Sequence, residues 1–369
     1  MKQPRPRRAS AQLAARLAFT LVTALLAAAC GAGAAPARST EAGGAAPGAS
    51  ATGEQWTALV ATAKREGEVV IYGPPGANFR EALVRPFEAA YPGIKVSFTG
   101  ASGSDLGPRI LAERQAGQFI PDVHVGGTTT INDVLKPAGV VDPIPPLLVR
   151  PDVTDTARWF ENQLWWADNE QQYNLMFEGS ASQIVTVNKS LVDPNSFTAY
   201  WDVLDPKYRG KIVASDIRRP GPGGGQSRFL WMTEGLGPPF LEKLFGEMDV
   251  ALTEDRRQLV DWVAQGRYTI GLFAGQEVDE AIKQGLPVAH VDTRKLKEGF
   301  AVSAGWGSVA MMNQAPHPNA ARVYLNWLLA PEGQLAWQHA TGGNSLRTDV
   351  AKEMVDPLNV PPPGSKVFF

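Results

Sequence analysis

Apolar positions along the chain alternate between the spacings typical of strands and of helices. "EVVIYG" (68–73) and "IKVSFTG" (94–100) are short apolar runs that predict buried strands. Between them, "FREALVRPFEAAYPG" (79–93) places apolar residues at helical spacing and predicts one helix. Because parallel strands are joined through a helix, this order predicts an α/β fold with mainly parallel sheets covered by helices.

The same alternation continues to the end of the chain after one interruption. Residues 142–183 are rich in Pro, Trp and Gln and break the pattern, and the glycine-rich segment 216–228 predicts a loop. Further strands are predicted at 183–192, 207–217, 268–275, 286–292 and 306–313, and helices at 239–248, 254–266, 277–285 and 318–340. About 315 residues can fold, more than one hydrophobic core usually covers, so we expect two lobes.

Composition narrows the class of protein. Charged residues make up 20% of the chain and the formal net charge is −2, which suits neither a disordered chain nor a nucleic-acid-binding protein. A single cysteine excludes an internal disulfide and a zinc site built from several thiolates. The four histidines are scattered without ligand spacing. We expect no cofactor, no metal site and no nucleic-acid partner.

The N-terminal residues have the pattern of an export signal. Residues 1–16 carry five basic side chains and no acidic one, and residues 17–29 are apolar or small. That apolar run is shorter than the roughly 20 residues a permanent membrane helix needs, so residues 1–29 predict a signal peptide.

The only cysteine, Cys30, follows this leader directly. "AAAC" (27–30) resembles a bacterial lipobox, in which the thiol is acylated and the chain is cut just before it. Residues 30–53 have almost no large apolar side chain and predict a flexible tether. We expect Cys30 to carry a lipid that attaches the protein to a membrane outside the cytoplasm. The alternative is an ordinary secretory peptide with an incidental cysteine.

Four stretches together resemble the solute-binding proteins of bacterial ABC transporters, of the two-lobed periplasmic type II. They are "GEVVIYGPPGANFREALVRPFEAAYPGIKV" (67–96), "ERQAGQFIPDVHVGG" (113–127), "YRGKIVASDI" (208–217) and "APHPNAARVYLNWLLAPEGQ" (315–334). The resemblance covers nearly all of residues 54–369. The nearest branch is that of the ferric-iron and small-anion binders.

This resemblance implies two lobes, 54–185 plus 300–369 and 190–295, joined by crossover strands. "IVTVN" (184–188) and "GSVAMMN" (307–313) are the expected crossovers. The protein would act as a monomer, capture a small solute between the lobes outside the carboxyl ends of the strands, and deliver it to a membrane permease.

Loops that follow the strands supply the candidate ligand-binding residues. Ser102 and Ser104 precede one predicted helix, and Thr128 and Thr129 open another, where backbone N–H groups favour an anion. Helix capping alone explains these hydroxyls equally well.

Other candidates come from the second lobe and from the aromatic residues. Arg218 and Arg219, with Gln226, lie in the glycine-rich segment, where guanidinium groups could pair with a carboxylate or phosphate. Solvated arginines on a surface loop are the alternative. Trp166 and Trp306 could stack on a ligand.

The iron ligands of the ferric-iron-binding branch can be compared with the residues at the corresponding positions of this sequence. Members of that branch carry a His in the first loop and two adjacent Tyr after the strand that corresponds to 268–275. Here the first loop, 73–78, has no His, and Gln276 and Glu277 occupy the tyrosine positions. We expect these two residues to face the ligand, and we expect a small organic anion or a polar aromatic or sugar-like solute. Ferric iron is the alternative.

The sequence lacks the common motifs of hydrolytic enzymes. The sequence has no Gly-x-Ser-x-Gly elbow and no His-Glu-x-x-His. A secreted hydrolase and a ligand-sensing subunit remain alternatives to transport. We expect a binding protein and not an enzyme.

Overall fold

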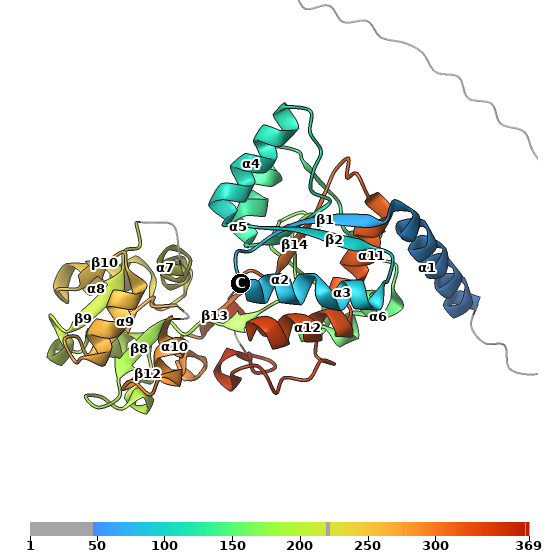
Figure 1. Ribbon diagram of the computed structural model, residues 1–369. Helices are drawn as coiled ribbons and strands as arrows, with labels where there is room; N and C mark the ends of the chain where they lie inside the picture. Colours follow the sequence, from blue (N-terminus) through green and yellow to red (C-terminus); the bar gives the residue numbers. More distant parts are fainter. Residues whose placement is uncertain (1–46, 219–221, 276, 366, 369) are drawn as a thin grey trace, which may run out of the picture. The chain divides into compact units, whose positions relative to one another are not determined.

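The computed structural model describes residues 47–218, 222–275, 277–365 and 367–368 (Figure 1). The predicted signal peptide, Cys30, Arg219 and Gln276 lie outside the described residues. The chain divides into two units, 1–46 and 47–369, and the description below concerns the second.

The first large sheet has seven strands in the order β2-β1-β3-β14-β6-β5, with β4 paired to β14. Their bounds are β1 Glu68–Gly73, β2 Lys95–Gly100, β3 Val123–Gly126, β4 Val141–Asp142, β5 Trp165–Trp166, β6 Leu175–Met176 and β14 Ser308–Met312. Strand β1 pairs in parallel with β2 and β3, whereas β14 runs antiparallel to β3, β4 and β6.

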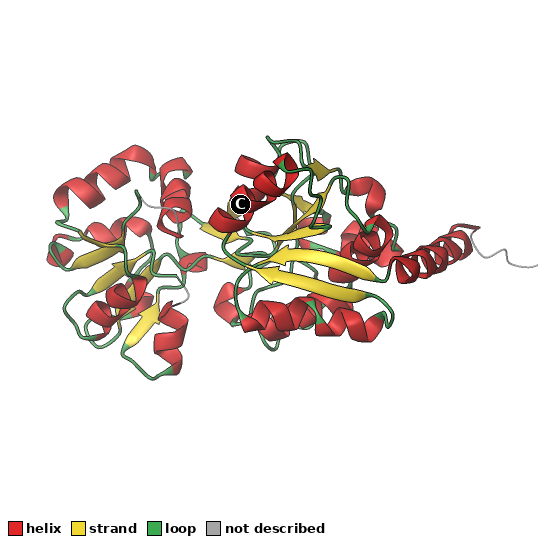
Figure 2. Ribbon diagram, turned by 45° about the horizontal axis from the view of Figure 1, so that its top comes forward, coloured by secondary structure: helices red, strands yellow, loops and turns green. Residues whose placement is uncertain are grey.

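Helices cover both faces of this sheet (Figures 1 and 2). Their bounds are α1 Pro47–Glu66, α2 Ala77–Leu83, α3 Arg85–Ala90, α4 Gly103–Gln115, α5 Thr128–Thr130, α6 Pro151–Thr154, α11 Pro318–Leu328 and α12 Pro331–Thr341. Val69 and Ile71 of β1 join the core that α11 and α12 help to form, while Tyr72 packs with Leu106 and Ile110 of α4. Neighbouring residues of β1 therefore serve opposite faces, as strand geometry requires.

The second large sheet has five strands in the order β10-β9-β11-β8-β12. Their bounds are β8 Val185–Asn188, β9 Ile212–Ser215, β10 Ala251–Thr253, β11 Ile270–Leu272 and β12 Val288–His290. The helices of this part are α7 Pro222–Met232, α8 Gly237–Glu247, α9 Arg256–Ala264 and α10 Glu277–Lys283. Strand β9 is parallel to β10 and β11, and β8 is antiparallel to β11 and β12.

The segments that run between the two large sheets form a small sheet of their own. Strand β13 (Phe300–Ser303) pairs antiparallel with β7 (Ser180–Ala181) and parallel with β15 (Val367–Phe368). The crossovers expected at 184–188 and 307–313 are therefore misplaced: β8 and β14 belong to the two large sheets. Both are buried at every position, which is typical of strands inside a covered sheet.

The predicted α/β fold with crossover strands is confirmed, with three differences. The sheets are mixed, because β14 returns to the first sheet from the opposite direction. The helix predicted at 79–93 is divided at Val84, since Pro86 follows and offers no backbone N–H. The loop predicted at 216–228 is wrong from Pro222, where α7 begins, because Pro suits the first position of a helix.

Candidate functional site

A pocket of about 220 Å³ lies between the crossover segments and the part of the chain that holds the five-stranded sheet. We call it the crossover pocket, and the residues that line it are Glu178, Ser180, Ala181, Ser182, Gln183, Gln226, Gly275, Asp279, His290, Ser303, Gly305 and Asn359. The first crossover supplies Glu178 and residues 180–183, and the second supplies Ser303 and Gly305. The five-stranded part supplies Gln226, Gly275, Asp279 and His290, and Asn359 comes from the C-terminal segment.

Glu178 is the buried acid of this pocket. Only 8% of the residue is exposed, and its Oε2 accepts a hydrogen bond of 2.8 Å from the indole N–H of the fully buried Trp337. The Ser180 hydroxyl donates a longer bond of 3.4 Å to Oε1. Burial raises the pKa of Glu178 to about 8, against the opposing effect of these two hydrogen bonds.

Three glycines enclose the Glu178 side chain. A Cβ atom at Gly307 would lie 2.1 Å from the Cβ of Glu178, and one at Gly343 would lie 2.6 Å from its carboxylate. Gly305 has a φ of 53°, a left-handed conformation that favours glycine, and a Cβ there would lie 2.9 Å from Oε1 of Glu178. The backbone is thus packed directly on the carboxyl group, which fixes its position.

On the other side of the pocket, α10 and β12 supply Asp279 and His290. His290 Nε2 lies 2.9 Å from Asp279 Oδ1, and the His290 side chain is only 6% exposed. Its Nδ1 atom is buried without a hydrogen-bond partner, and so is Oε1 of Gln226. These polar atoms remain available to a bound molecule.

An aromatic cluster backs the Glu178 carboxyl group. Phe79 makes ring contacts with Trp306 and Trp337 at 6.2 and 5.5 Å between centroids, and Phe177 packs edge-on against Trp337 at 5.1 Å. Trp306 is half-buried and packs against the main core. The cluster keeps water away from one side of Glu178 and thereby contributes to its desolvation.

The predicted hydroxyl residues lie at the helix starts where the sequence placed them. Ser102 is the N-cap residue of α4, but its hydroxyl contacts Ser104 at 2.7 Å and donates to Asp105 at 2.5 Å in place of capping the helix. Thr128 and Thr129 open α5, next to Gly127. These four residues are not among those that line the crossover pocket.

The predicted arginine and tryptophan residues have other surroundings. Arg218 has a side chain that is 76% exposed and forms two hydrogen bonds with Asp216, at 2.8 and 2.7 Å. Glu277 pairs with Arg256 at 2.9 Å. Trp166 lies in β5 and packs on the core. Of the predicted residues that the structure describes, Gln226 lines the crossover pocket.

Sequence reasoning missed Glu178, Ser180, Asp279 and His290. Glu178 precedes "GSASQIVTVN", and a carboxylate immediately before a crossover was the available signal. In the sequence, Asp279 and His290 look like ordinary polar residues of a helix and of a strand end, and nothing in their spacing indicates that they contact each other.

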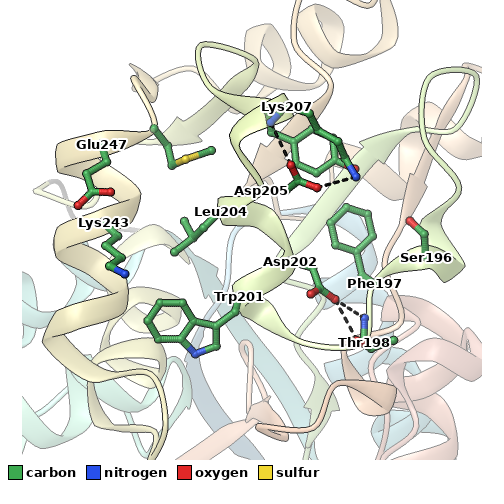
Figure 3. A pocket seen from close by; sticks show the side chains of 12 residues that line it. Ser196, Phe197, Thr198, Trp201, Asp202, Leu204, Asp205, Lys207, Lys243 and Glu247 are labelled. Carbon is green, nitrogen blue, oxygen red and sulfur yellow. Dashed lines mark hydrogen bonds and ion pairs between the residues drawn. The ribbon is translucent and has the colours of Figure 1, made fainter.

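A larger hollow of about 630 Å³ lies on the five-stranded part, between α8 and the turns at Tyr200–Leu204 and Pro206–Tyr208 (Figure 3). Asp202, Asp205 and Lys207 in its lining are occupied locally. Asp202 accepts hydrogen bonds from the backbone N–H of Thr198 and Ala199, and Lys207 pairs with Asp205 at 2.8 Å. Buried polar atoms of its lining are satisfied within the wall, so we regard the crossover pocket as the candidate site.

The described residues also bear on metal binding and on membrane spanning. That part of the chain holds no group of three or more His, Cys, Asp and Glu side chains able to hold a metal ion. Within the same residues, none of the helices combines the length and the apolar character needed to cross a bilayer.

Comparison with known proteins identifies a family. The family model described as bacterial extracellular solute-binding protein matches residues 72–335. No curated protein matches the chain.

Solved structures share the fold at low sequence identity. Trichodesmium IdiA (FutA), in complex with iron and citrate ligands, has 19% identity and a TM-score of 0.60, over 79% of this chain and 89% of that one. Iron-bound HitA from Pseudomonas aeruginosa has 16% identity and a TM-score of 0.58, over 80% and 92%. AfuA from Actinobacillus pleuropneumoniae, with fructose-6-phosphate bound, has 18% identity and a TM-score of 0.52, over 82% and 89%.

Proposed function

The chain belongs to the bacterial extracellular solute-binding proteins, and on that premise we propose that it is the substrate-binding lipoprotein of an ABC importer. It captures a small solute in the crossover pocket and presents it to a membrane permease. The observation that carries this proposal is the pocket itself, which is lined by both crossover segments and by elements of the five-stranded part.

Pockets between packed units suit this function for a physical reason. A ligand that contacts both the crossover segments and the five-stranded part stabilises the conformation in which residues from both reach it. A permease can then distinguish the loaded protein from the empty one. We propose that one lobe comprises residues 54–185 and 300–369 and the other comprises residues 190–295. The two lobes would then move relative to each other when the protein closes on its ligand.

A solute screen tests this function directly. Binding to the native state raises the melting temperature by mass action, so the purified protein is heated with metals including Fe³⁺, phosphates, carboxylates, sugars, amines and aromatic acids. We expect one chemical class to raise the melting temperature in proportion to the logarithm of its concentration. If none of these solutes changes the melting temperature, the solute-binding proposal is wrong.

Cys30 would anchor the protein beside its permease. The proposal rests on the apolar leader, on the residues 27–30 and on the polar tether that follows. Mass spectrometry of the membrane-extracted protein should give a chain that begins at Cys30 and carries acyl groups. An unmodified thiol on the mature chain would exclude the anchor and leave solute binding intact.

A further inference from the structure

The crossover pocket is acidic and rich in hydrogen-bond acceptors. Glu178 and Asp279 approach it from different elements, and none of the described residues that line it is Lys or Arg. Two arginines of the five-stranded part are engaged elsewhere: Arg256, beside Gly275, pairs with Glu277, and Arg218 pairs with Asp216.

The buried polar atoms of the pocket that lack a hydrogen-bond partner are also acceptors. When Nε2 of His290 donates its proton to Asp279, the buried Nδ1 of the neutral ring is an acceptor without a donor. Oε1 of Gln226 is a second buried acceptor without a donor. A carboxylate has about four acceptor positions, and Glu178 uses two of them, for Trp337 and Ser180.

Such a pocket needs a ligand that brings several N–H donors and a positive charge. An ammonium group offers three donors and a guanidinium group five. An anion placed here would lie beside the carboxyl groups of Glu178 and Asp279, and no Lys or Arg side chain of the described lining could pair with it. Such an arrangement is unfavourable in a buried site.

Resting on the proposed function, we propose that the solute is a small organic cation, a primary amine or a guanidine, and that Glu178 is its counter-ion. Asp279 and the Nδ1 atom of His290 accept its remaining N–H donors. The three glycines that pack on Glu178 hold the carboxyl group in place before the ligand arrives, which lowers the cost of ordering it.

Binding of a cation is then linked to loss of a proton. Burial raises the pKa of Glu178 to about 8, so the carboxyl group is largely protonated at neutral pH and the cation displaces that proton. The groups that contact Glu178 from α12 and β7, Trp337 and Ser180, are uncharged, and Asp279 and His290 are the other titratable groups of the pocket. Affinity should rise by up to about tenfold per pH unit between pH 6 and 8.

The test compares organic cations with a neutral probe of similar size, 1-butanol, and with anionic probes. Butylamine, putrescine and agmatine are compared with 1-butanol, phosphate, citrate and fructose 6-phosphate by thermal shift and calorimetry on the full mature protein. We expect at least one of the three cations to bind and 1-butanol to have no effect. Glu178→Gln, which keeps the size and the acceptor for Trp337, should lower the affinity for that cation at least tenfold and remove the pH dependence.

The control is Glu353→Gln, which removes one exposed carboxylate away from the pocket and should leave the affinity within about twofold. If the cations fail while phosphate, citrate, the sugar phosphate or Fe³⁺ binds, the cation assignment is wrong and the solute-binding function stands. If Glu178→Gln binds a cation as well as the wild type does, Glu178 is not the counter-ion. If no solute of any charge binds, the proposed function fails as well.

Discussion

His317 donates its backbone N–H to Oδ1 of Asp122 at 2.8 Å, and its ring Nδ1 lies 2.9 Å from Oδ2 of the same carboxylate. The backbone N–H of Val70 also donates to Oδ2, at 2.7 Å. Asp122 is fully buried, so this one side chain joins β1, the start of β3 and the segment that leads into α11. Desolvation raises the pKa of Asp122, and the hydrogen bonds from Val70 and His317 oppose that effect.

Asp122→Ala should therefore destabilise the protein strongly. The change leaves the N–H groups of Val70 and His317 buried without an acceptor, and we expect a loss of about 3 kcal/mol in the free energy of unfolding. Urea denaturation followed by circular dichroism measures it. His317→Ala is the matched variant, because it keeps the backbone donor and should cost only about 1 kcal/mol. Equal losses for the two variants would contradict this account.

Glu178 should make stability depend on pH in a defined interval. Its pKa in the folded protein, about 8, lies above its ordinary value of 4.5, so the folded state holds the proton more tightly than the unfolded chain. Stability from this group is complete below pH 4.5 and is lost as pH rises to about 8, by a few kcal/mol.

The measurement is the free energy of unfolding between pH 5 and 9, for the wild type and Glu178→Gln. The neutral amide does not titrate, so the difference in stability between variant and wild type should grow with pH and level off above pH 8. Because other groups titrate equally in both proteins, they cancel in the difference. A constant difference across this range would show that Glu178 has an ordinary pKa.

Arg347 holds together segments that are distant in the sequence. Its side chain is fully buried, donates two hydrogen bonds of 2.8 Å to Asp349, and donates to the carbonyl oxygens of Asp152 and Leu329. The guanidinium also lies 5.3 Å from the ring centroid of Trp159. Arg347→Lys retains the charge but cannot reproduce this forked geometry, and we expect a loss of about 3 kcal/mol.

Arg158→Lys provides the comparison for Arg347→Lys. Arg158 also donates to Asp349, at 3.1 Å, but its side chain is 45% exposed. An exposed ion pair contributes little, so this variant should lose less than about 1 kcal/mol. Thermal unfolding of both variants under one buffer condition decides the matter. Similar losses would mean that burial does not determine the contribution of these arginines.

The spacing of apolar residues predicted many strands and helices well, because the buried face of a strand or helix repeats at a fixed interval. Strand β1 and helix α9 lie within the ranges that their apolar residues indicated. Most members of the candidate site were not predicted, because they come from segments that are distant in the sequence. Ser102 and Arg218 stand in polar loops as expected, yet nearby acids, Asp105 and Asp216, occupy them. No local spacing connects Glu178 with Trp337, which is 159 positions away.

Gly307 gives a test of the geometry around Glu178. A Cβ at this position would lie 2.1 Å from the Cβ of Glu178 and 3.2 Å from the carbonyl oxygen of Ala304, so neither the backbone nor the side-chain stem can accept it without moving. Gly307→Ala should cost about 1–3 kcal/mol of stability, as overpacking of a core does. It should also displace the carboxyl group from Trp337 and weaken solute binding.

Gly246→Ala is the matched control for this substitution. Gly246 lies in α8, is exposed, and a Cβ there meets no atom within 4 Å, so alanine should stabilise the helix by up to about 1 kcal/mol. Chemical denaturation gives both stabilities, and calorimetry with the solute identified by the screen gives both affinities. If Gly307→Ala bound that solute as tightly as Gly246→Ala does, solute binding would not depend on the position of the Glu178 carboxyl group in the crossover pocket.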